Sequence, residues 1–587
     1  MTLRTSSNSI NPCSNLFKFT VKRNIGVIIL FTLIMLLVCP GYVLNEISEV
    51  LKSPSYLRHA YDLTKNLNMV CIGVSITVCA LSALFCCLNF SFLYSKKSGD
   101  VYFSLPLTRN ELFISRFFAS TVPLLIPTAL CYLSLWFVSL TPYANISVPA
   151  LVACFAISTV AMFMTASITM LFIVCSGSVL DLLISFFGVN VGLILCATIF
   201  SGLCNELLLG YSSGDTYGKI SIVSPFFYAV YKVAQMRSIF THGGWSHIFG
   251  NIWVFVVRLL VTGAVAFTAA ILLHRRRKSE KCEDSYAYSF MYYACSLIIA
   301  FVVSDILGEL FGAYTILSVK FWVFAAIGSV LAAVTYGAIS NRGFKTVKKS
   351  IVTGIIPVTA LGLITVILAT GGLGYKTRIP AAHTIKSAEY SSLGLSIDFE
   401  DPELITALHK KAIESATKSI DIDEYSEDVT DSTYNRSYQY FDLTYNLAGG
   451  RTLKRSYHVQ IRKCVDELLA IYRSDEHGKA LKARTALFVR SGVTAYDYGS
   501  LGDNADVPTL SGMVTGSTFD RLIDAYVADI KNATEASIYQ DGVRHIQIDS
   551  RKENNEYISI DLYVEEGYTE TLSILDELHL QVNSDVE

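Results

Sequence analysis

The stretch that decides the fold is residues 94–116, which read YSKKSGDVYFSLPLTRNELFISR. It lies between two long apolar runs and carries four basic residues, Lys96, Lys97, Arg109 and Arg116. Basic residues in short loops of membrane proteins stay on the cytoplasmic side. The pattern therefore predicts that this stretch faces the cytoplasm.

Within the stretch, the residues predict a turn that is followed by a capped helix. Pro106 ends any helix that comes from Tyr102. Thr108, with Glu111 three residues later, forms a capping-box pattern. After the cap, apolar residues repeat at helical spacing, at Leu112, Phe113 and Phe117. The pattern favours a short amphipathic helix under the membrane that a cytoplasmic partner can push; the alternative is an ordinary connecting loop.

A family resemblance rests on the same residues. The pattern KK-x-x-D-x-Y-x-S-L-P-x-x-R, from Lys96 to Arg109, resembles the cytoplasmic loop of ABC-2-type transporter permease subunits of Gram-positive bacteria. The stretch from His274 to Tyr288 resembles the loop after the sixth span in a subgroup with extra spans and a C-terminal extracytoplasmic domain. The stretch from Tyr440 to Val459 resembles part of that domain. The family often has a histidine where Phe103 stands, so no role carries over to that position.

The resemblance implies a site and several partners. In that family the loop is the coupling helix, here residues 102–116, which touches a separate ABC ATPase subunit. The residues that would make this contact are Ser104, Leu105, Pro106, Thr108, Arg109 and Glu111. The resemblance also implies a second permease copy or a paralogue, in a homodimer or heterodimer. Substrates of the group include drugs, antimicrobial peptides and lipid-like molecules, and nothing in this chain selects among them.

Composition separates a membrane part from a soluble part. Of the 587 residues, 52% are hydrophobic, and the mean hydropathy is +0.44, as is typical of integral membrane proteins. From Tyr375 onward the chain holds 22 Lys and Arg against 36 Asp and Glu, whereas the preceding part holds 25 against 13. A basic part followed by an acidic part indicates two domains. Membrane lipids are an expected partner, and nucleic acid is not.

Nine apolar runs are each long enough to cross the hydrocarbon layer, which takes roughly 20 helical residues. They are residues 25–44, 68–94, 114–140, 148–175, 179–204, 252–274, 287–311, 319–340 and 351–374. A cytoplasmic N-terminus places every basic loop cluster inside. An odd number of spans then places the C-terminal domain outside the cell membrane.

The expected fold is a polytopic α-helical membrane protein with a C-terminal α+β extracytoplasmic domain, and the resemblance implies an ABC-2-type core. The expected parts are a cytoplasmic N-terminus with an interfacial elbow helix (1–24), a six-span core (25–274), three additional spans (275–374) and the α+β domain (375–587). The core contains an outer loop, residues 205–251. Aromatic residues after Pro225 predict a re-entrant or interfacial helix pair in this loop, and the alternative is a partly ordered surface loop.

The C-terminal domain alternates strand and helix patterns. Ser387 to Phe399 alternates as one strand, and two runs around Gly449-Gly450 indicate a hairpin, at residues 439–447 and 452–461. Helical periods lie at residues 401–418, 465–472 and 519–530, and a closing pair of strands is expected at 545–549 and 557–563. No internal repeat is apparent in this part.

The chain shows no catalytic motif in a supporting context. It has no G-x-x-x-x-G-K-[ST] phosphate loop, so we expect no enzyme activity and no cofactor in this chain; ATP and Mg²⁺ belong to the partner ATPase. Gly210 to Gly214 matches G-x-S-x-G without the strand-turn-helix context of a nucleophile elbow. His242 and His247 are more typical of a loop than of a metal site, and no metal site is expected. Thirteen of the fourteen cysteines precede Tyr375 and are interpreted as small apolar fillers.

Three charges stand inside apolar runs. Arg258 lies in the sixth run, and Asp305 and Glu309 lie four residues apart in the seventh, on one helical face. An unpaired charge at the centre of a span costs roughly 2.5–3.5 kcal/mol on insertion scales. We therefore expect Arg258 to pair with Asp305 or Glu309; the alternative is that the side chains reach the membrane boundary.

These observations predict the permease subunit of an ATP-driven ABC-type exporter, powered by a separate nucleotide-binding subunit. The alternative is a membrane sensor or scaffold. Its outer domain would bind a peptide or a cell-wall ligand, and its spans would relay a signal.

Overall fold

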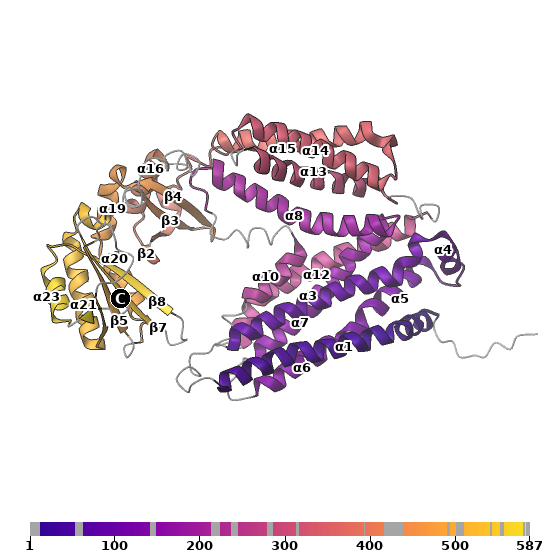
Figure 1. Ribbon diagram of the computed structural model, residues 1–587, viewed down its shortest axis with the longest axis horizontal. Helices are drawn as coiled ribbons and strands as arrows, with labels where there is room; N and C mark the ends of the chain where they lie inside the picture. Colours follow the sequence, from indigo (N-terminus) through magenta and orange to yellow (C-terminus); the bar gives the residue numbers. More distant parts are fainter. Residues whose placement is uncertain are drawn as a thin grey trace, which may run out of the picture. The chain divides into compact units, whose positions relative to one another are not determined.

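The computed structural model describes residues 12–52, 63–140, 148–212, 224–235, 245–278, 286–312, 316–392, 394–415, 438–489, 493–500, 510–539, 543–551, 557–578 and 581–582. The chain divides into two compact units (Figure 1). The helical unit comprises Met1–Ile199 and Thr216–Leu361, and the C-terminal unit comprises Phe200–Asp215 and Gly362–Glu587.

Nine helical segments within the described residues are long and apolar enough to cross a membrane, the number predicted from the sequence. Eight of them are single helices: α1 (Pro12–Lys52), α3 (Leu63–Phe90), α7 (Val148–Cys175), α8 (Val179–Leu207), α12 (Trp245–Arg276), α13 (Ser289–Phe311), α14 (Val319–Ser340) and α15 (Val347–Ala369). The third segment joins α5 (Arg109–Thr121), the short 3-10 helix η2 (Val122–Leu124) and α6 (Leu125–Ser139). Pro123 lacks the backbone N–H that a continuous α-helix needs, which explains the 3-10 turn.

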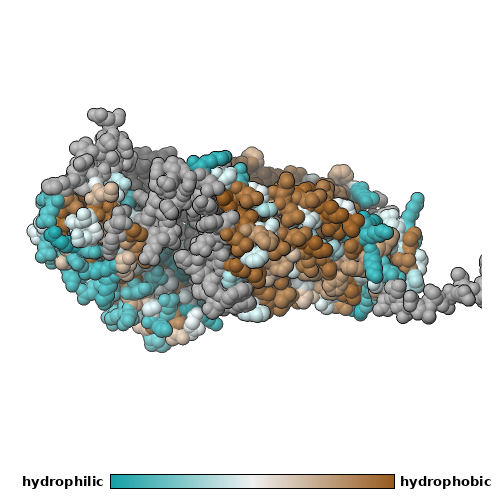
Figure 2. Space-filling view, turned by 90° about the horizontal axis from the view of Figure 1, so that it is seen from below, coloured by the Kyte–Doolittle hydropathy of each residue, from teal (hydrophilic) through white to brown (hydrophobic). Residues whose placement is uncertain are grey.

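The surface of the helical unit is apolar. Figure 2 shows hydrophobic side chains gathered over its helices. Large apolar side chains such as Leu37, Val254 and Val265 are exposed there. In water such a surface would be unfavourable, whereas against lipid tails it loses nothing. The chain is therefore a multi-pass membrane protein.

The predicted elbow helix is continuous with the first span. α1 runs without a break from Pro12, because no residue near Lys22 ends a helix. In the predicted outer loop, α10 (Pro225–Gln235) packs against α3 and α7. One helix of the predicted pair is therefore present, and residues 213–223 and 236–244 lie outside the described residues.

Glycines set the distance between α13 and α14. A Cβ atom on Gly308 would lie 2.6 Å from the Cε2 atom of Phe321, and one on Gly312 would lie 2.5 Å from the Cα atom of the same residue. Neither distance is possible without moving a helix. Small residues allow helices in membranes to pack closely, and here they hold the aromatic ring of α14 against α13.

The C-terminal unit contains two sheets, each with its own helices, which we call the first and second lobes (Figure 1). The first lobe comprises β1 (Ile385–Ser392), β2 (Leu395–Phe399), α16 (Glu403–Ser415), β3 (Tyr438–Leu447), β4 (Thr452–Gln460) and α19 (Val465–Tyr472). The second comprises β5 (Val493–Ser500), β6 (Leu510–Val514), α21 (Gly516–Asp529), α22 (Glu535–Tyr539), β7 (Arg544–Arg551), β8 (Tyr557–Val564), α23 (Thr569–Glu577) and β9 (Gln581–Val582). Between them in the chain lies α20 (Asp475–Thr485).

The two lobes repeat one topology. The first sheet has the antiparallel order β2-β1-β3-β4, and the second has the order β8-β7-β5-β6-β9. Read from its other end and without the short β9, the second order is β6-β5-β7-β8. Each lobe therefore follows the course strand, strand, helix, strand, strand, helix, with the second strand at one edge. The sequence pattern alone did not reveal this repeat.

Most predicted elements of the C-terminal domain are confirmed. The hairpin of β3 and β4, the helices α16, α19 and α21, and the pair β7 and β8 lie where the patterns placed them. The single strand predicted from Ser387 to Phe399 is wrong, because the chain turns back at Gly394 and forms β1 and β2. Gly394 has φ +77°, a conformation that favours glycine. Apolar residues keep alternating with polar ones through this turn, so the sequence pattern does not mark where one strand ends and the next begins.

A buried histidine joins the helix and the sheet of the first lobe. His409 on α16 contacts the hydroxyl of Tyr445 through Nδ1 at 2.9 Å and that of Tyr457 through Nε2 at 2.8 Å. Burial, helped by the positive charge of Arg455, lowers the pKa of His409 to about 4. The folded lobe therefore favours the neutral imidazole ring of His409 over the protonated one.

Replacing Gly308 with leucine should destabilise the helical unit. The Gly308→Leu side chain would overlap the ring of Phe321 and separate α13 from α14, at a cost of about 1–3 kcal/mol. Thermal unfolding of the purified protein in detergent measures this loss. Gly26→Leu is the matched control, because no heavy atom lies within 4 Å of that Cβ position. Equal unfolding temperatures for the two variants would contradict this account of the packing.

The stability of the C-terminal unit should depend on pH through His409. Because the folded pKa lies below the ordinary 6.5, its contribution is fully present above pH 6.5 and is lost as the pH falls toward 4. We expect the unfolding temperature of the intact chain to decrease across this window. His409→Gln should make the decrease shallower, whereas His383→Gln, at an exposed position, should leave it unchanged.

Candidate functional site

The predicted cytoplasmic stretch forms two short helices separated by a turn. α4 (Lys96–Phe103) ends before the turn that contains Pro106, and α5 begins directly after Thr108. The Thr108 hydroxyl oxygen accepts a hydrogen bond from the Glu111 N–H at 3.3 Å, and the Glu111 carboxylate accepts one from the Thr108 N–H at 2.8 Å. The predicted capping box is confirmed.

The apolar stripe of α5 is buried in the helical unit. Phe113 and Phe117 contact the ring of Phe267 on α12, with ring centroids 5.7 and 4.7 Å apart, and Leu112 is also buried. Since α5 leads into the third apolar segment through η2, its first turn is continuous with a span. A displacement of this turn would therefore move the span as well.

Arg109 joins the start of α5 to the end of α12. One of its guanidinium nitrogens, Nη1, donates to the carbonyl oxygens of Arg275 and Arg277 at 3.1 and 2.8 Å. In return, Arg275 donates to the side-chain oxygen of Asn110 at 2.6 Å. The two basic stretches that carry the family resemblance thus meet, a contact that the sequence analysis did not predict.

Arg277 extends the connection to two more helices. It is buried, and its Nη1 donates to the carbonyls of Ile173 and Val174 near the end of α7, at 3.0 and 2.9 Å. Its Nη2 donates to the carbonyl of Leu93, in the turn after α3, at 3.0 Å. The last carbonyls of a helix have no partner within that helix, so this side chain supplies donors that they need.

A second polar cluster lies around Asn89 on α3. Its side-chain oxygen accepts hydrogen bonds from Arg23 and Asn24 on α1, at 2.9 and 2.8 Å. Its backbone carbonyl accepts one from Arg116, whose guanidinium also lies 4.0 Å from the ring centroid of Tyr102. The sequence analysis counted Arg116 among the loop charges, but the structure leaves it only 1% exposed. No sequence pattern marked this burial.

The six residues predicted to contact the ATPase form one accessible rim. Five are exposed and Leu105 is half-buried; the exposed ones are Ser104, Pro106, Thr108, Arg109 and Glu111. The rim therefore combines one basic, one acidic and several small side chains on a turn fixed by the capping box. Its contact with an ATPase remains a prediction.

The three predicted intramembrane charges have different surroundings. Arg258 lies on α12 with its guanidinium 4.0 Å from the ring centroid of Tyr228 on α10. Asp305 is buried on α13, and Glu309 on the same helix is exposed. The expected pairing of Arg258 with Asp305 or Glu309 remains a prediction.

An apolar cavity lies in the helical unit between α3, α7, α8 and α10. Its empty space is about 1080 Å³, its open side included. Apolar side chains form most of the wall, among them Leu183, Phe187 and Phe226, and Thr165 and Asn190 are among its few polar members. A large apolar cavity with few polar groups suits an apolar or amphipathic molecule.

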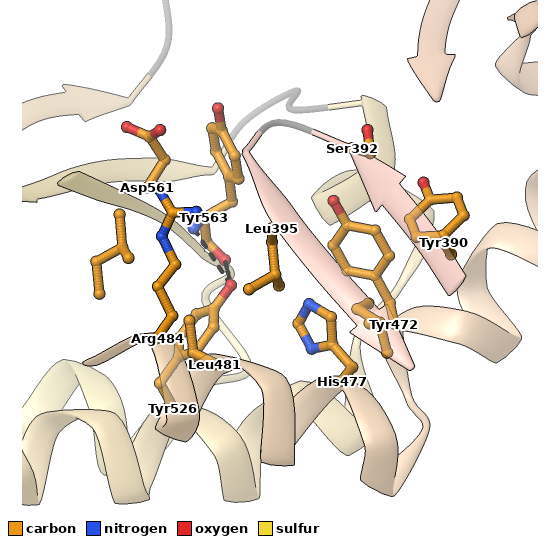
Figure 3. Close-up of a pocket in the computed structure, with 12 residues that line it drawn as sticks. Tyr390, Ser392, Leu395, Tyr472, His477, Leu481, Arg484, Tyr526, Asp561 and Tyr563 are labelled. Atoms are coloured by element: carbon orange, nitrogen blue, oxygen red, sulfur yellow. Dashed lines mark hydrogen bonds between the residues drawn. The ribbon is translucent and has the colours of Figure 1, made fainter. Parts of the chain in front are cut away.

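A second pocket lies between the two lobes of the C-terminal unit (Figure 3). Its empty space is about 620 Å³, its open side included. The first lobe supplies Tyr390 and Leu395, the second supplies Tyr526 and Tyr563, and α20 supplies His477, among other residues. Ligand pockets are common where two domains meet, and these walls combine apolar surface with hydroxyl groups.

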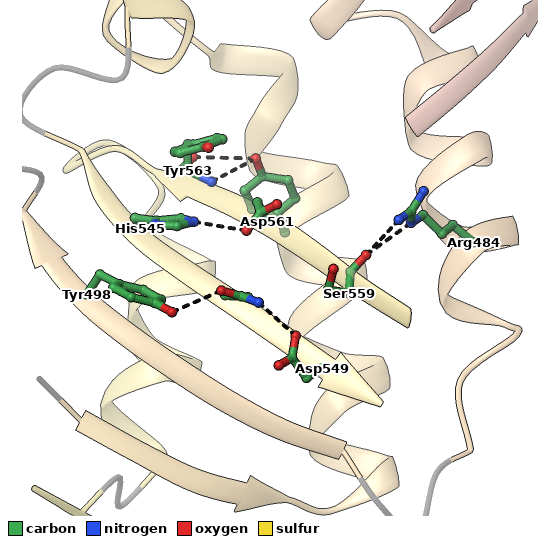
Figure 4. Close-up of polar contacts among 9 residues, drawn as sticks. Arg484, Tyr498, His545, Asp549, Ser559, Asp561 and Tyr563 are labelled. Carbon is green, nitrogen blue, oxygen red and sulfur yellow. Dashed lines mark hydrogen bonds and ion pairs between the residues drawn. The ribbon is translucent and has the colours of Figure 1, made fainter. Parts of the chain in front are cut away.

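Hydrogen bonds fix the second-lobe side of this pocket (Figure 4). Arg484 on α20 donates to the carbonyl of Ser559 through Nε and Nη2, at 3.2 and 2.8 Å. His545 pairs with Asp561 at 3.1 Å. Tyr498, His545 and Tyr563 also stack across three strands, with ring centroids 4.9 and 5.0 Å apart. Asp561 and Tyr563, which line the pocket, are therefore each held by contact with His545.

The other predicted positions lead to no site within the described residues. No group of three or more His, Cys, Asp or Glu side chains that could hold a metal ion occurs there. Gly214 and His242 lie outside the described residues, and nothing is described of the His247 side chain. Cys464 is buried, with its sulfur 3.0 Å from the Ser415 hydroxyl. The absence of catalysis and of a cofactor remains a prediction.

Removing the capping box should weaken the start of α5. Thr108→Ala leaves the Glu111 N–H without its acceptor, which costs about 0.5–2 kcal/mol. Thermal unfolding of the detergent-solubilised protein measures the loss, and Thr108→Ser should restore the stability. Ser104→Ala is the matched control in the same turn, because the Ser104 hydroxyl donates to the Val101 carbonyl of the preceding helix and bonds no other described residue. An unfolding temperature unchanged by Thr108→Ala would rule out the cap as a stabilising element.

Comparison of the chain with known protein families, with curated proteins and with solved structures gave no match. The resemblance to ABC-2-type permeases therefore rests on the sequence motifs alone.

Proposed function

We propose that this chain is the permease subunit of an ATP-driven ABC-type exporter. The observation that carries the proposal is the exposed rim at Ser104 to Glu111. It is held by a capping box and bonded to the end of another span. The chain has no phosphate-binding loop, so the driving ATPase is a separate subunit. When that subunit moves in response to nucleotide binding, it displaces the rim.

The bonds of the rim support this role. A force on the first turn of α5 reaches α12 through Arg109, and from there it reaches α7 and the end of α3 through Arg277. Each hydrogen bond contributes only about 0.5–1.5 kcal/mol. Together they connect the ends of four apolar helices, so a displacement of the rim is shared among them. A flexible connecting loop could not transmit it.

The proposed orientation follows from the basic loops. Lys96, Lys97 and Arg109 in the first basic loop, and Lys348 with Lys349 before α15, lie on the cytoplasmic side under the positive-inside rule. With nine spans, the N-terminus is then cytoplasmic and the C-terminal domain extracytoplasmic. Two copies, or one copy with a paralogue, would enclose the transport path.

The apolar cavity favours an amphipathic or lipid-like cargo. Its wall is almost entirely apolar, and polar groups such as Asn190 and Thr165 are few, which suits a molecule with a long apolar part and a small polar group. A strongly charged cargo would lose its hydration there without gaining partners.

The pocket of the C-terminal unit favours a second candidate function, that of a sensor. In this case the lobes bind an extracellular ligand and the spans relay its presence. A rim that recruits no ATPase, together with a ligand-binding outer domain, would support the sensor and not the exporter.

Charge reversal at Arg109 should remove the ATPase partner. The Arg109→Glu variant loses two donors to the end of α12 and places a negative charge on the rim. We expect wild-type protein, purified from its native membranes in mild detergent, to carry a Walker-motif subunit and ATPase activity. We expect at least about tenfold less of both with Arg109→Glu.

Lys348→Glu is the matched control, since it makes the same charge change at an exposed residue of another basic loop. It should keep the partner. Unfolding temperatures of all three proteins separate loss of the partner from loss of the fold. Wild-type protein that carries no nucleotide-binding subunit, or an Arg109→Glu variant that retains it, would overturn the proposal.

A further inference from the structure

Beside the inter-lobe pocket lies an acidic groove between β2 and α20. The groove and the pocket share Leu395 and Arg484 among their lining residues, so they are adjacent, and we call the two together the depression. Along β2 the groove is lined by Ser396, Asp398 and Glu400, and α20 contributes Glu476 among others. Its empty space is about 1350 Å³, its open side included.

One groove carboxylate has a counter-charge and two do not. Glu476 pairs with Lys479 of the same helix at 4.0 Å. Asp398 and Glu400, by contrast, are exposed and pair with no described residue. Glu389 on β1 lies directly opposite Asp398 in the sheet. Like charges opposite one another in a sheet destabilise it. A bound cation would relieve this repulsion.

A buried polar group points into the pocket itself. His477 is 6% exposed, and its ring stacks on Tyr472 with centroids 5.1 Å apart. Its Nδ1 atom has no hydrogen-bond partner among the described residues. Figure 3 shows the ring between Leu395 and Tyr472. A buried nitrogen without a partner costs free energy, and a ligand that enters the pocket can satisfy it.

We propose that this depression is a binding site for a cationic amphipathic peptide, with a tryptophan or tyrosine side chain in the pocket and basic side chains along the groove. The tyrosine hydroxyls and His477 would bind the polar edge of the anchoring side chain. Asp398, Glu400 and Glu476 would hold the basic groups. The inference does not rest on the transport function, because binding here needs no partner subunit.

The surrounding charges agree with this occupant. From Tyr375 onward the chain carries 36 acidic against 22 basic residues, so a cationic peptide is attracted to this part of the molecule before contact. Within the depression the basic groups are Lys479 and Arg484, and Arg484 is already bonded to the Ser559 carbonyl. An anionic peptide would instead be repelled by this excess of acidic residues.

The test is a binding measurement on the full chain in nanodiscs of phosphatidylcholine, which carries no net charge. The probe is a short dye-labelled peptide with lysines on both sides of one tryptophan, followed by fluorescence anisotropy. One companion replaces the lysines with glutamates, and the other replaces the tryptophan with glycine. We expect the first peptide to bind, the glutamate peptide not to bind, and the glycine peptide to bind at least about tenfold more weakly.

Two variants assign the binding to this site. The triple variant Asp398→Asn/Glu400→Gln/Glu476→Gln should lower the affinity at least about tenfold, because it removes the attracting charges. Leu395→Trp should do the same by filling the pocket. The control variant Glu535→Gln/Glu566→Gln/Glu570→Gln removes the same charge from exposed positions elsewhere on the unit and should bind as the wild type does.

Three results would overturn the proposal: no binding of the lysine-tryptophan peptide, equal affinity of the two triple variants, or equal affinity for the tryptophan and glycine peptides. The last would mean general charge attraction without an anchored side chain. The triple variant changes only polar groups at accessible positions, so it keeps the test decisive even if Leu395→Trp fails to fold. The proposed exporter function could fail in its own ATPase assay while every result here stands.

Discussion

Backbone polar groups inside an apolar layer need hydrogen-bond partners, and the helical unit depends on meeting this need where helices end. Arg277 illustrates the solution, because its buried guanidinium donates to three carbonyls at the ends of two helical segments. Near the end of α3, the side-chain oxygen of Asn89 accepts hydrogen bonds from the side chains of Arg23 and Asn24 on α1. Together with the bonds of Arg109, these contacts connect α1 to the neighbouring ends of α3, α5, α7 and α12. The accessible turn before α5 owes its fixed position to them.

Local patterns were enough to predict much of this architecture. Apolar runs of sufficient length indicated all nine segments, since length and hydropathy alone decide whether a helix suits a membrane. The capping box of Thr108 and Glu111 could be read because both partners lie within one helical turn. The hairpin of β3 and β4 followed from its Gly-Gly turn in the same way. In each case the interacting residues are close in the chain.

What escaped prediction depends on residues that are far apart in the chain. The burial of Arg116 follows from Asn89 and Tyr102 folding over it, and neither is marked by spacing. The contact of Arg109 with Arg277 joins two loops separated by four spans. The repeated lobe topology and the pocket between the lobes are visible only once both sheets are formed. The hairpin at Gly394 was missed for a local reason. Apolar residues keep alternating with polar ones through the turn and into β2.

The repeated topology of the lobes has a mechanical consequence. Each lobe has its own antiparallel sheet and helices, but only part of the walls around His477. The aromatic cleft draws on both lobes, with Tyr390 from one and Tyr563 from the other, and on the linking helix α20. A molecule in this cleft would therefore touch both lobes at once, and any change in their separation would change its affinity.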